Sequence, residues 1–182
     1  MDLSAIAAQV CKLGACNAGI VNVSAIIFDR SFRVLCESNA CGNYGKCWMC
    51  PPYAGDIDQL IQIAQNYQKA LVYQTISVLK DSYDFDGMME AAQRHGKLAL
   101  SLSYFFSELP FPRKLHLGAG GCHMCDVCAK QLNEPCRRPE HATPALEAYG
   151  VNVSSLATSS GMRYINGSCT VTYFGALLFC ET

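Results

Sequence analysis

Four cysteines in the second half of the chain have a spacing that suits an iron-sulfur cluster. They lie in the segment GCHMCDVCAKQLNEPC, and they are Cys122, Cys125, Cys128 and Cys136. Two residues separate the successive members of the first three, and seven more precede the fourth. A tight loop with this spacing can direct three thiolates at one cubic cluster, as in the C-x2-C-x2-C run of bacterial ferredoxins. Zinc sites usually draw on two separated pairs, so this loop favours iron and sulfide.

A glycine-rich turn, GAGG, comes directly before this loop and contains Gly118, Gly120 and Gly121. Glycine has no side chain, so backbone N–H groups in such a turn can approach a ligand closely and donate to thiolate or sulfide sulfurs. We expect these three glycines to contact the cofactor. Their hydrogen bonds would raise its reduction potential.

A second group of cysteines occurs in the segment CESNACGNYGKCWMCPP. Its members are Cys36, Cys41, Cys47 and Cys50. Four cysteines within fifteen residues can surround one metal centre, and the step from Cys50 to Pro51 is similar to the Cys-Pro step that ends ferredoxin motifs. The spacing is less diagnostic than that of the other loop. Structural zinc is therefore a stronger alternative here, and Tyr44 and Trp48 are expected to shield either kind of centre from water.

The remaining residues with metal-binding chemistry are less informative. Four further cysteines are expected to be ordinary buried thiols, because free cysteine behaves as a small hydrophobic residue; they are Cys11, Cys16, Cys169 and Cys180. His116 and His123 could tune a cluster or replace a cysteine ligand, but a packed or solvated histidine is the more common case. Arg137 and Arg138 follow Cys136 and could offset the negative charge of a thiolate-bound cluster.

Composition is typical of a globular protein in a reducing compartment. Of the 182 residues, 51% are hydrophobic and 16% are charged. The net charge of −1 does not indicate a binding surface for nucleic acid or an anionic membrane. The amino-terminal segment lacks the pattern of a secretory signal, and the apolar run over residues 19–28 is too short to span a membrane. We therefore expect a cytoplasmic protein. Its twelve cysteines then indicate metal binding rather than disulfides.

The hydrophobic pattern predicts the elements that must position these loops. Strands are expected at residues 20–28, 70–79, 114–117 and 170–179. Helices are expected at 56–70, 85–106, 142–150 and 151–161, with Asp56 and Asn152 near two helix starts and Gly150 as a possible stop. This order predicts an α/β fold: a single compact domain over residues 1–182, with a mixed sheet of about four to five strands and flanking helices. Both cysteine loops should then leave the same end of the sheet.

Three segments together resemble a known family. CGNYGKCWMCPPYAG, LGAGGCHMCDVCAKQLNEPCRRPEHATPALEAYGVNV and TVTYFGALLF are similar to an uncharacterised family of predicted metal-binding proteins that is common in anaerobic bacteria and archaea. The resemblance covers the chain from about residue 13 onward. It implies metal binding through seven cysteines: Cys36, Cys41 and Cys50 in one group, and Cys122, Cys125, Cys128 and Cys136 in the other. It implies no established reaction.

Cys47 departs from this family pattern, which usually has another residue at its position. Cys47 could complete the ligand set of a second cluster. Alternatively, Cys36, Cys41 and Cys50 could hold a cluster with one iron open to water, a side chain or a substrate. Exchange of ligands between the two groups is a third arrangement, because in two-cluster ferredoxins the distant cysteine serves the other cluster.

Three functions are compatible with these residues. The first is an electron carrier with one or two [4Fe-4S] clusters that serves a redox partner protein. The second is a redox enzyme with an open iron, for which Tyr44, Lys46 and Glu147 are nearby polar candidates. The third is an interaction module stabilised by zinc. A homodimer is also compatible with the sequence, because phenylalanines such as Phe105 and Phe174 could line an interface as readily as a core.

Overall fold

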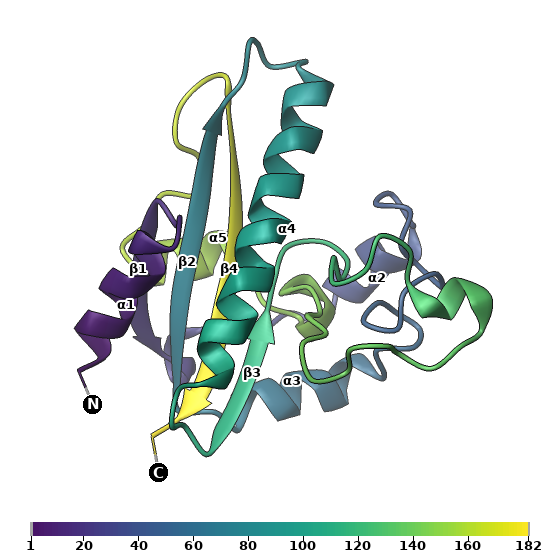
Figure 1. Ribbon diagram of the computed structural model, residues 1–182, viewed down its shortest axis with the longest axis horizontal. Helices are drawn as coiled ribbons and strands as arrows, with labels where there is room; N and C mark the ends of the chain where they lie inside the picture. The colour runs from purple at the N-terminus through teal and green to yellow at the C-terminus, as the bar shows by residue number, and fades with distance from the viewer. Residues whose placement is uncertain (1, 182) are drawn as a thin grey trace.

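The backbone of the computed structural model, which describes residues 2–181, is organised by one four-stranded sheet (Figure 1). Its strands are β1 (Asn17–Asn22), β2 (Lys69–Val78), β3 (Arg113–Leu117) and β4 (Thr170–Cys180). They lie in the order β1-β2-β4-β3, and every neighbouring pair is antiparallel. The α/β class predicted from the sequence is confirmed, with one compact domain.

The sheet is antiparallel throughout rather than mixed, which corrects the sequence prediction. The long helix α4 (Phe85–Ser107) connects β2 to β3, and these two strands run in the same direction. They would form a parallel pair if they were neighbours. The last strand, β4, lies between them and pairs with β2 over ten residues, so no parallel contact remains. The order of elements along the chain does not reveal this insertion.

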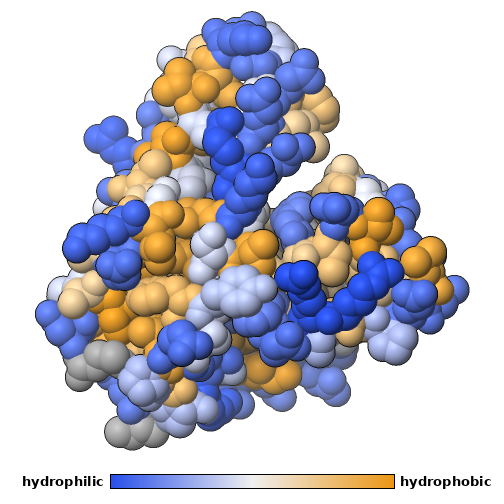
Figure 2. Space-filling view, in the orientation of Figure 1, coloured by the Kyte–Doolittle hydropathy of each residue, from blue (hydrophilic) through white to orange (hydrophobic). Residues whose placement is uncertain are grey.

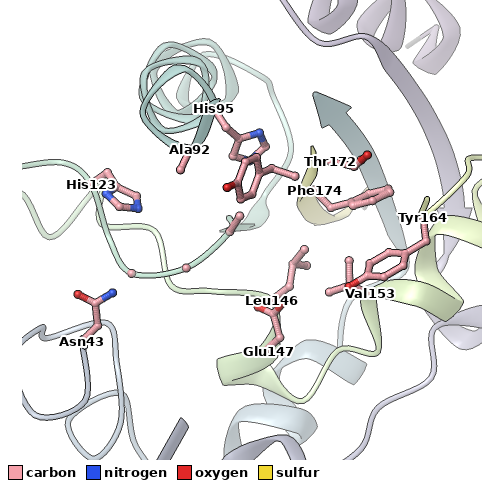
Figure 3. A pocket seen from close by; sticks show the side chains of 14 residues that line it. Asn43, Ala92, His95, His123, Leu146, Glu147, Val153, Tyr164, Thr172 and Phe174 are labelled. Carbon is pink, nitrogen blue, oxygen red and sulfur yellow. The ribbon is translucent and has the colours of Figure 1, made fainter. Parts of the chain in front are cut away.

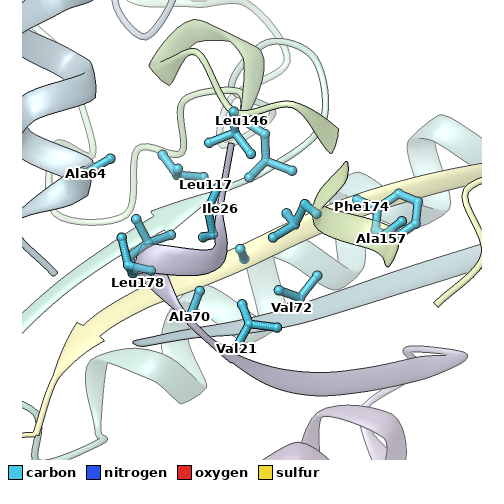
Figure 4. Packing of buried hydrophobic residues seen from close by; sticks show 14 residues of the cluster. Val21, Ile26, Ala64, Ala70, Val72, Leu117, Leu146, Ala157, Phe174 and Leu178 are labelled. Carbon is cyan, nitrogen blue, oxygen red and sulfur yellow. The ribbon is translucent and has the colours of Figure 1, made fainter. Parts of the chain in front are cut away.

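The alternation of side chains along the two central strands creates two hydrophobic layers. On one face, Leu71 and Tyr73 of β2 pack with α4 and with the amino-terminal helix α1 (Leu3–Lys12). On the other face, Val72 of β2 and Phe174 of β4 belong to a cluster that also includes Leu156 of α5 (Val153–Ser159) and Ala64 of α3 (Ile57–Gln65) (Figure 4). This period of two is the pattern expected for strands covered on both faces.

Several predicted boundaries shift in the structure. The first strand ends at Asn22 instead of continuing to residue 28, because the chain turns into the short 3-10 helix η1 (Val23–Ala25). Helix α3 ends at Gln65, since β2 begins four residues later. The helix expected over 142–150 is only the 3-10 turn η3 (Glu147–Tyr149), which Gly150 ends with a positive φ of 70°. The predicted caps are confirmed, since Asp56 and Asn152 both accept N–H bonds at helix starts.

The two cysteine loops do not leave the same end of the sheet. The first loop follows β1 and the second follows β3, and the register places the end of β1 level with the start of β3. The first loop instead travels through the short helix α2 (Phe32–Glu37) to reach the second loop beside β3, where Figure 1 shows the two segments together at the right. Their meeting therefore depends on long irregular connections. No helix within residues 2–181 has the length and apolar character that a membrane crossing requires.

Two glycines lie against side chains from other elements, but only one of them leaves no room for a Cβ atom. Gly175 of β4 lies opposite Tyr73 of β2, and a Cβ atom at position 175 would overlap the Tyr73 ring. Gly96 lies in the middle of α4, where His123 from the second cysteine loop packs against it. A Cβ atom at position 96 would be 3.4 Å from His123, which is an ordinary contact.

We predict opposite outcomes for alanine at these two positions. Gly175→Ala should lower the free energy of unfolding by about 2 kcal/mol, because the fully buried Tyr73 ring has no free space to enter. Gly96→Ala should be neutral or stabilising by up to about 1 kcal/mol, because alanine favours a helix interior. Urea unfolding of both variants tests this contrast. Equal stability of Gly175→Ala and the wild-type protein would contradict the packing described above.

Candidate metal centre

All four cysteines of the second loop border one small space. Cys122, Cys125, Cys128 and Cys136 line a cavity of about 20 Å³. The loop has little regular structure, but the 3-10 helix η2 (Ala129–Leu132) starts directly after Cys128. A salt bridge of 3.0 Å joins Arg137 to Glu134, and Arg137 also donates to the carbonyl of Val127. These local bonds fold the loop back on itself, so its thiols face a shared interior.

Cys47 reaches this same cavity from the first loop. Its side chain is buried, and it accepts hydrogen bonds from the Cys50 thiol and from the backbone N–H groups of Met49 and Cys122, which lower the pKa of Cys47. The hydrogen bond to Cys47 and burial raise the pKa of Cys50. The hydrogen bond between them therefore favours the charged form of Cys47 and the neutral form of Cys50. Cys47 thus lies between the two cysteine groups and contacts both.

The other three cysteines of the first loop surround a second, larger cavity of about 260 Å³. Cys36 comes from the last turn of α2, and Cys41 and Cys50 come from the loop that follows. Burial is the main cause that raises the pKa of Cys36, partly opposed by the nearby Arg33. Tyr44 and Glu147 contribute polar groups to the same cavity. The structure therefore divides the first loop into a group of three cysteines and Cys47.

The glycine turn lies between the two loops. Gly120 and Gly121 line the larger cavity, and Gly120 has a positive φ of 67°. A Cβ atom on Gly121 would press against the side chain of Asn43 in the first loop. Gly118 differs from the other two, because its N–H donates to the carbonyl of Pro144 and its carbonyl accepts from Leu146. Its role toward a cofactor stays a prediction, whereas Gly120 and Gly121 border a space next to cysteine thiols.

An aromatic contact holds the two loops together. Trp48 donates through Nε1 to the carbonyl of Glu134 at 2.9 Å, which connects the first loop to the second. Its ring packs edge-on against Tyr53 at 5.3 Å, and the ammonium group of Lys130 lies over both rings. Such contacts combine apolar burial with a cation-π attraction. Trp48 therefore covers the wall of the smaller cavity, which agrees with its expected shielding role.

The chemistry of the donor set fits a thiolate-bound metal. All twelve cysteines are free thiols, so no disulfide competes for those in the loops. Within residues 2–181, however, no three Cys, His, Asp or Glu side chains approach closely enough to hold one metal ion. The thiols are distributed around shared spaces.

The candidate histidine and cysteine residues outside the two loops lie elsewhere in the structure. His116 lies beneath α4, where its Nε2 is 2.8 Å from the Tyr73 hydroxyl, and it lines neither cysteine cavity. Of the four cysteines expected to be buried thiols, only Cys180 is fully buried. Cys16 is exposed directly before β1, where it accepts a hydrogen bond from the backbone N–H of Ile76. The expectation of burial was therefore wrong for Cys16, because an edge position leaves one side of the strand open.

A third cavity, of about 350 Å³, was not predicted from the sequence. It lies between α4, the glycine turn, η3 and β4, and Figure 3 shows His95, His123 and Glu147 in its wall. Burial raises the pKa of Glu147. Burial also lowers the pKa of His95 to about 4, with His123 contributing and the backbone of Phe174 partly opposing. The sequence signal in this part of α4 is Gly96, a glycine in the middle of a predicted helix. It does not indicate which residues from other segments line the cavity.

The comparison with protein families agrees with this site. The family model described as "Predicted metal-binding protein (DUF2284)" matches residues 19–179 and therefore includes both cysteine loops and nearly all of the central sheet. The chain belongs to this family of predicted metal-binding proteins. No curated protein and no solved structure matches the chain.

The buried His95 predicts a pH dependence of stability. Its pKa is near 4 in the folded protein and about 6.5 in an unfolded chain, so the unfolded state binds the proton first as the pH falls. Stability should therefore decrease below pH ~6.5, by about 1.4 kcal/mol per pH unit from this residue. Urea unfolding of His95→Gln should show a slope shallower by that amount between pH ~6.5 and pH ~5. Identical slopes in both proteins would contradict the burial of a neutral imidazole.

Proposed function

We propose that this protein is an iron-sulfur protein that transfers electrons to a redox partner. The observation that carries the proposal is the shared cavity bordered by Cys122, Cys125, Cys128 and Cys136. A cluster of the [4Fe-4S] type requires four ligands around one volume, and these thiols provide them from a single loop. Four partly buried thiolates would repel one another without a metal, because uncompensated charge is costly where water is partly excluded. The irons would supply the compensating charge.

A second cluster is proposed at the larger cavity, with Cys36, Cys41 and Cys50 as ligands. These three cysteines border one space, as the four in the other loop do. Cys47 lies between the two positions and has hydrogen bonds to both sides. It could serve either cluster or stay near both as a free thiolate. In each arrangement the clusters are neighbours, which suits the passage of one electron at a time.

The proposed partner is a redox protein that approaches the cysteine loops. Exposed apolar side chains lie in or next to these loops, among them Val34, Leu35, Val127 and Leu132. Figure 2 shows hydrophobic side chains on the lobe at the right, which the loops form in this view. A transient interface needs such an apolar centre with polar groups around it. Exposed basic side chains, such as Arg137 and Arg138, would favour an acidic partner.

A cytoplasmic location is part of the proposal, because reducing conditions keep thiols available to bind metal. Reducing conditions also suit the anaerobic bacteria and archaea in which, from the sequence resemblance, we expect this family to be common. Zinc in the place of either cluster is the main alternative for the cofactor. Metal analysis distinguishes it directly, because zinc proteins are colourless and contain no sulfide.

A second candidate function is a redox enzyme with an open iron. The size of the cavity at Cys36, Cys41 and Cys50 favours it, since about 260 Å³ is close to the lower limit for small-molecule sites. With three cysteine ligands, one iron of a cubic cluster would face this space. Tyr44 and Glu147 line it and could exchange protons with a bound molecule. Lys46, the third residue considered from the sequence, is not among the lining residues.

The cluster in the second loop predicts a selective effect of serine substitutions. Protein purified without oxygen should be brown and should contain about four iron and four sulfide ions per cluster. Cys128→Ser should lose about half of both if two clusters are present. Cys169→Ser, outside both cavities, is the matched control and should keep the full content. Stoichiometric zinc without sulfide would rule out the proposal.

Cys47→Ser distinguishes the carrier from the enzyme. If Cys47 is a ligand, the substitution should shift the absorption and electron paramagnetic resonance spectra, because oxygen replaces sulfur on one iron. An unchanged spectrum would mean that the cluster at Cys36, Cys41 and Cys50 has only three cysteine ligands. That result would favour the enzyme over the electron carrier. Cys16→Ser serves as the control for loss of a thiol elsewhere.

A further inference from the structure

The cavity of about 350 Å³ beside α4 adjoins the proposed cluster site but contains no cysteine. It shares Gly120, Gly121 and Glu147 with the cavity that Cys36, Cys41 and Cys50 border. The two spaces are thus separated by a wall that is mainly glycine backbone and one carboxyl side chain. Figure 2 shows the molecular surface hollowed between the upper part of α4 and the lobe at the right. A small molecule could therefore reach this position from solvent.

Its walls combine a flat apolar side with a polar side. Tyr164 and Phe174 stack nearly parallel, with an interplanar angle of 19° and ring centroids 6.0 Å apart, and both line the cavity. The polar groups come from other elements: Asn43 from the first cysteine loop, Glu147 from η3 and His95 from α4 (Figure 3). Aromatic faces of this kind bind planar ligands by stacking.

One polar group in the wall has no protein partner at normal hydrogen-bond geometry, although the backbone of Phe174 lies close enough to affect its pKa. His95 is 2% exposed, and its Nδ1 is 2.9 Å from the hydroxyl of Thr75. Its other ring nitrogen, Nε2, is buried and makes no hydrogen bond of normal geometry. Leaving a buried polar atom unpaired costs free energy of about 1–3 kcal/mol, so a ligand that bonds to it would recover that cost.

The charge of the lining restricts the ligand. No lysine or arginine is among the described residues that border the cavity. An anion would therefore lose its hydration with no cationic partner except a protonated His123, which is unfavourable above neutral pH. A carboxyl group, an amide and a neutral imidazole can each exchange hydrogen bonds with an uncharged ligand. The volume is also within the usual range for sites of small molecules.

We propose that this cavity is a binding site for an uncharged, planar organic molecule that carries an amide-like or heterocyclic hydrogen-bonding group. Stacking on Tyr164 and Phe174 would hold its flat face, and Asn43, His95 and Glu147 would fix its polar edge. The inference goes beyond the proposed electron transfer, because binding here requires no metal. It also identifies where a substrate would lie next to the cluster site if the protein is an enzyme.

Benzamide and benzoate are suitable probes, because they share a ring and nearly the same size but differ in charge. Titration calorimetry of the complete, anaerobically purified protein should give a dissociation constant of roughly 1 mM or tighter for benzamide. Benzoate should bind at least about tenfold more weakly, because it has no cationic partner. Equal or tighter binding of benzoate would overturn the proposed ligand class. No detectable binding of benzamide would overturn the site.

Two variants test whether the probe occupies this cavity. Ala92→Leu places a larger side chain in its wall and should abolish benzamide binding, whereas Ala8→Leu, on an exposed position of α1, should leave it unchanged. Tyr164→Ala removes part of the aromatic wall at a half-exposed position and should weaken binding by about fivefold. Retained benzamide affinity in both cavity variants would overturn the assignment.

Iron and sulfide are measured in the same samples, so the two proposals are tested separately. Benzamide binding in protein without iron would support the cavity site and contradict the iron-sulfur function. Iron-loaded protein that does not bind benzamide would contradict the cavity site alone.

Discussion

The contact between the two cysteine loops is the constraint on which the rest of the site depends. Each loop alone has little regular secondary structure, so its position depends on contacts with the other loop. Cys47 accepts N–H bonds from Met49 in its own loop and from Cys122 in the other, and Trp48 donates to Glu134. These bonds stabilise a buried thiolate and align the two chain segments. Metal ions would add the positive charge that a larger group of thiolates needs.

The sheet supports this contact from a distance. Because β4 is inserted between β2 and β3, β3 becomes the edge strand, and the second loop starts at that edge. The bridge between Gly118 and Ala145 then brings the end of the loop back beside its beginning. Helix α4 packs across β2 and supplies His95 and Gly96 to the space near the loops. The core thereby fixes the two ends of an otherwise irregular segment.

The family match includes both cysteine loops and nearly the whole described sheet. The family description is of predicted metal-binding proteins, and the structure brings cysteines of both loops around two cavities. The distribution of cysteines over two cavities adds a division that the family description does not contain. It separates Cys47 from Cys36, Cys41 and Cys50, although all four belong to one short segment.

Local signals in the sequence predicted local structure well. The periodicity of residues 85–106 predicted α4 within one residue, and Asn152 was identified as a cap because its side chain can accept a backbone N–H. The eight loop cysteines were predicted from their spacing to be metal ligands, and the structure places them around two cavities. The sequence could not predict that β4 enters between β2 and β3, since strand order depends on pairing across the whole chain. For the same reason it did not reveal that Cys47 meets Cys122, or that His95 and Glu147 line one cavity.

Anomalous X-ray scattering from crystals grown without oxygen tests the central claim most directly. Data collected just above the iron edge should show strong density beside Cys122, Cys125, Cys128 and Cys136, with a second centre beside Cys36, Cys41 and Cys50. Density that appears only above the zinc edge, as a single ion at either position, would contradict the account. So would iron located away from both cysteine loops.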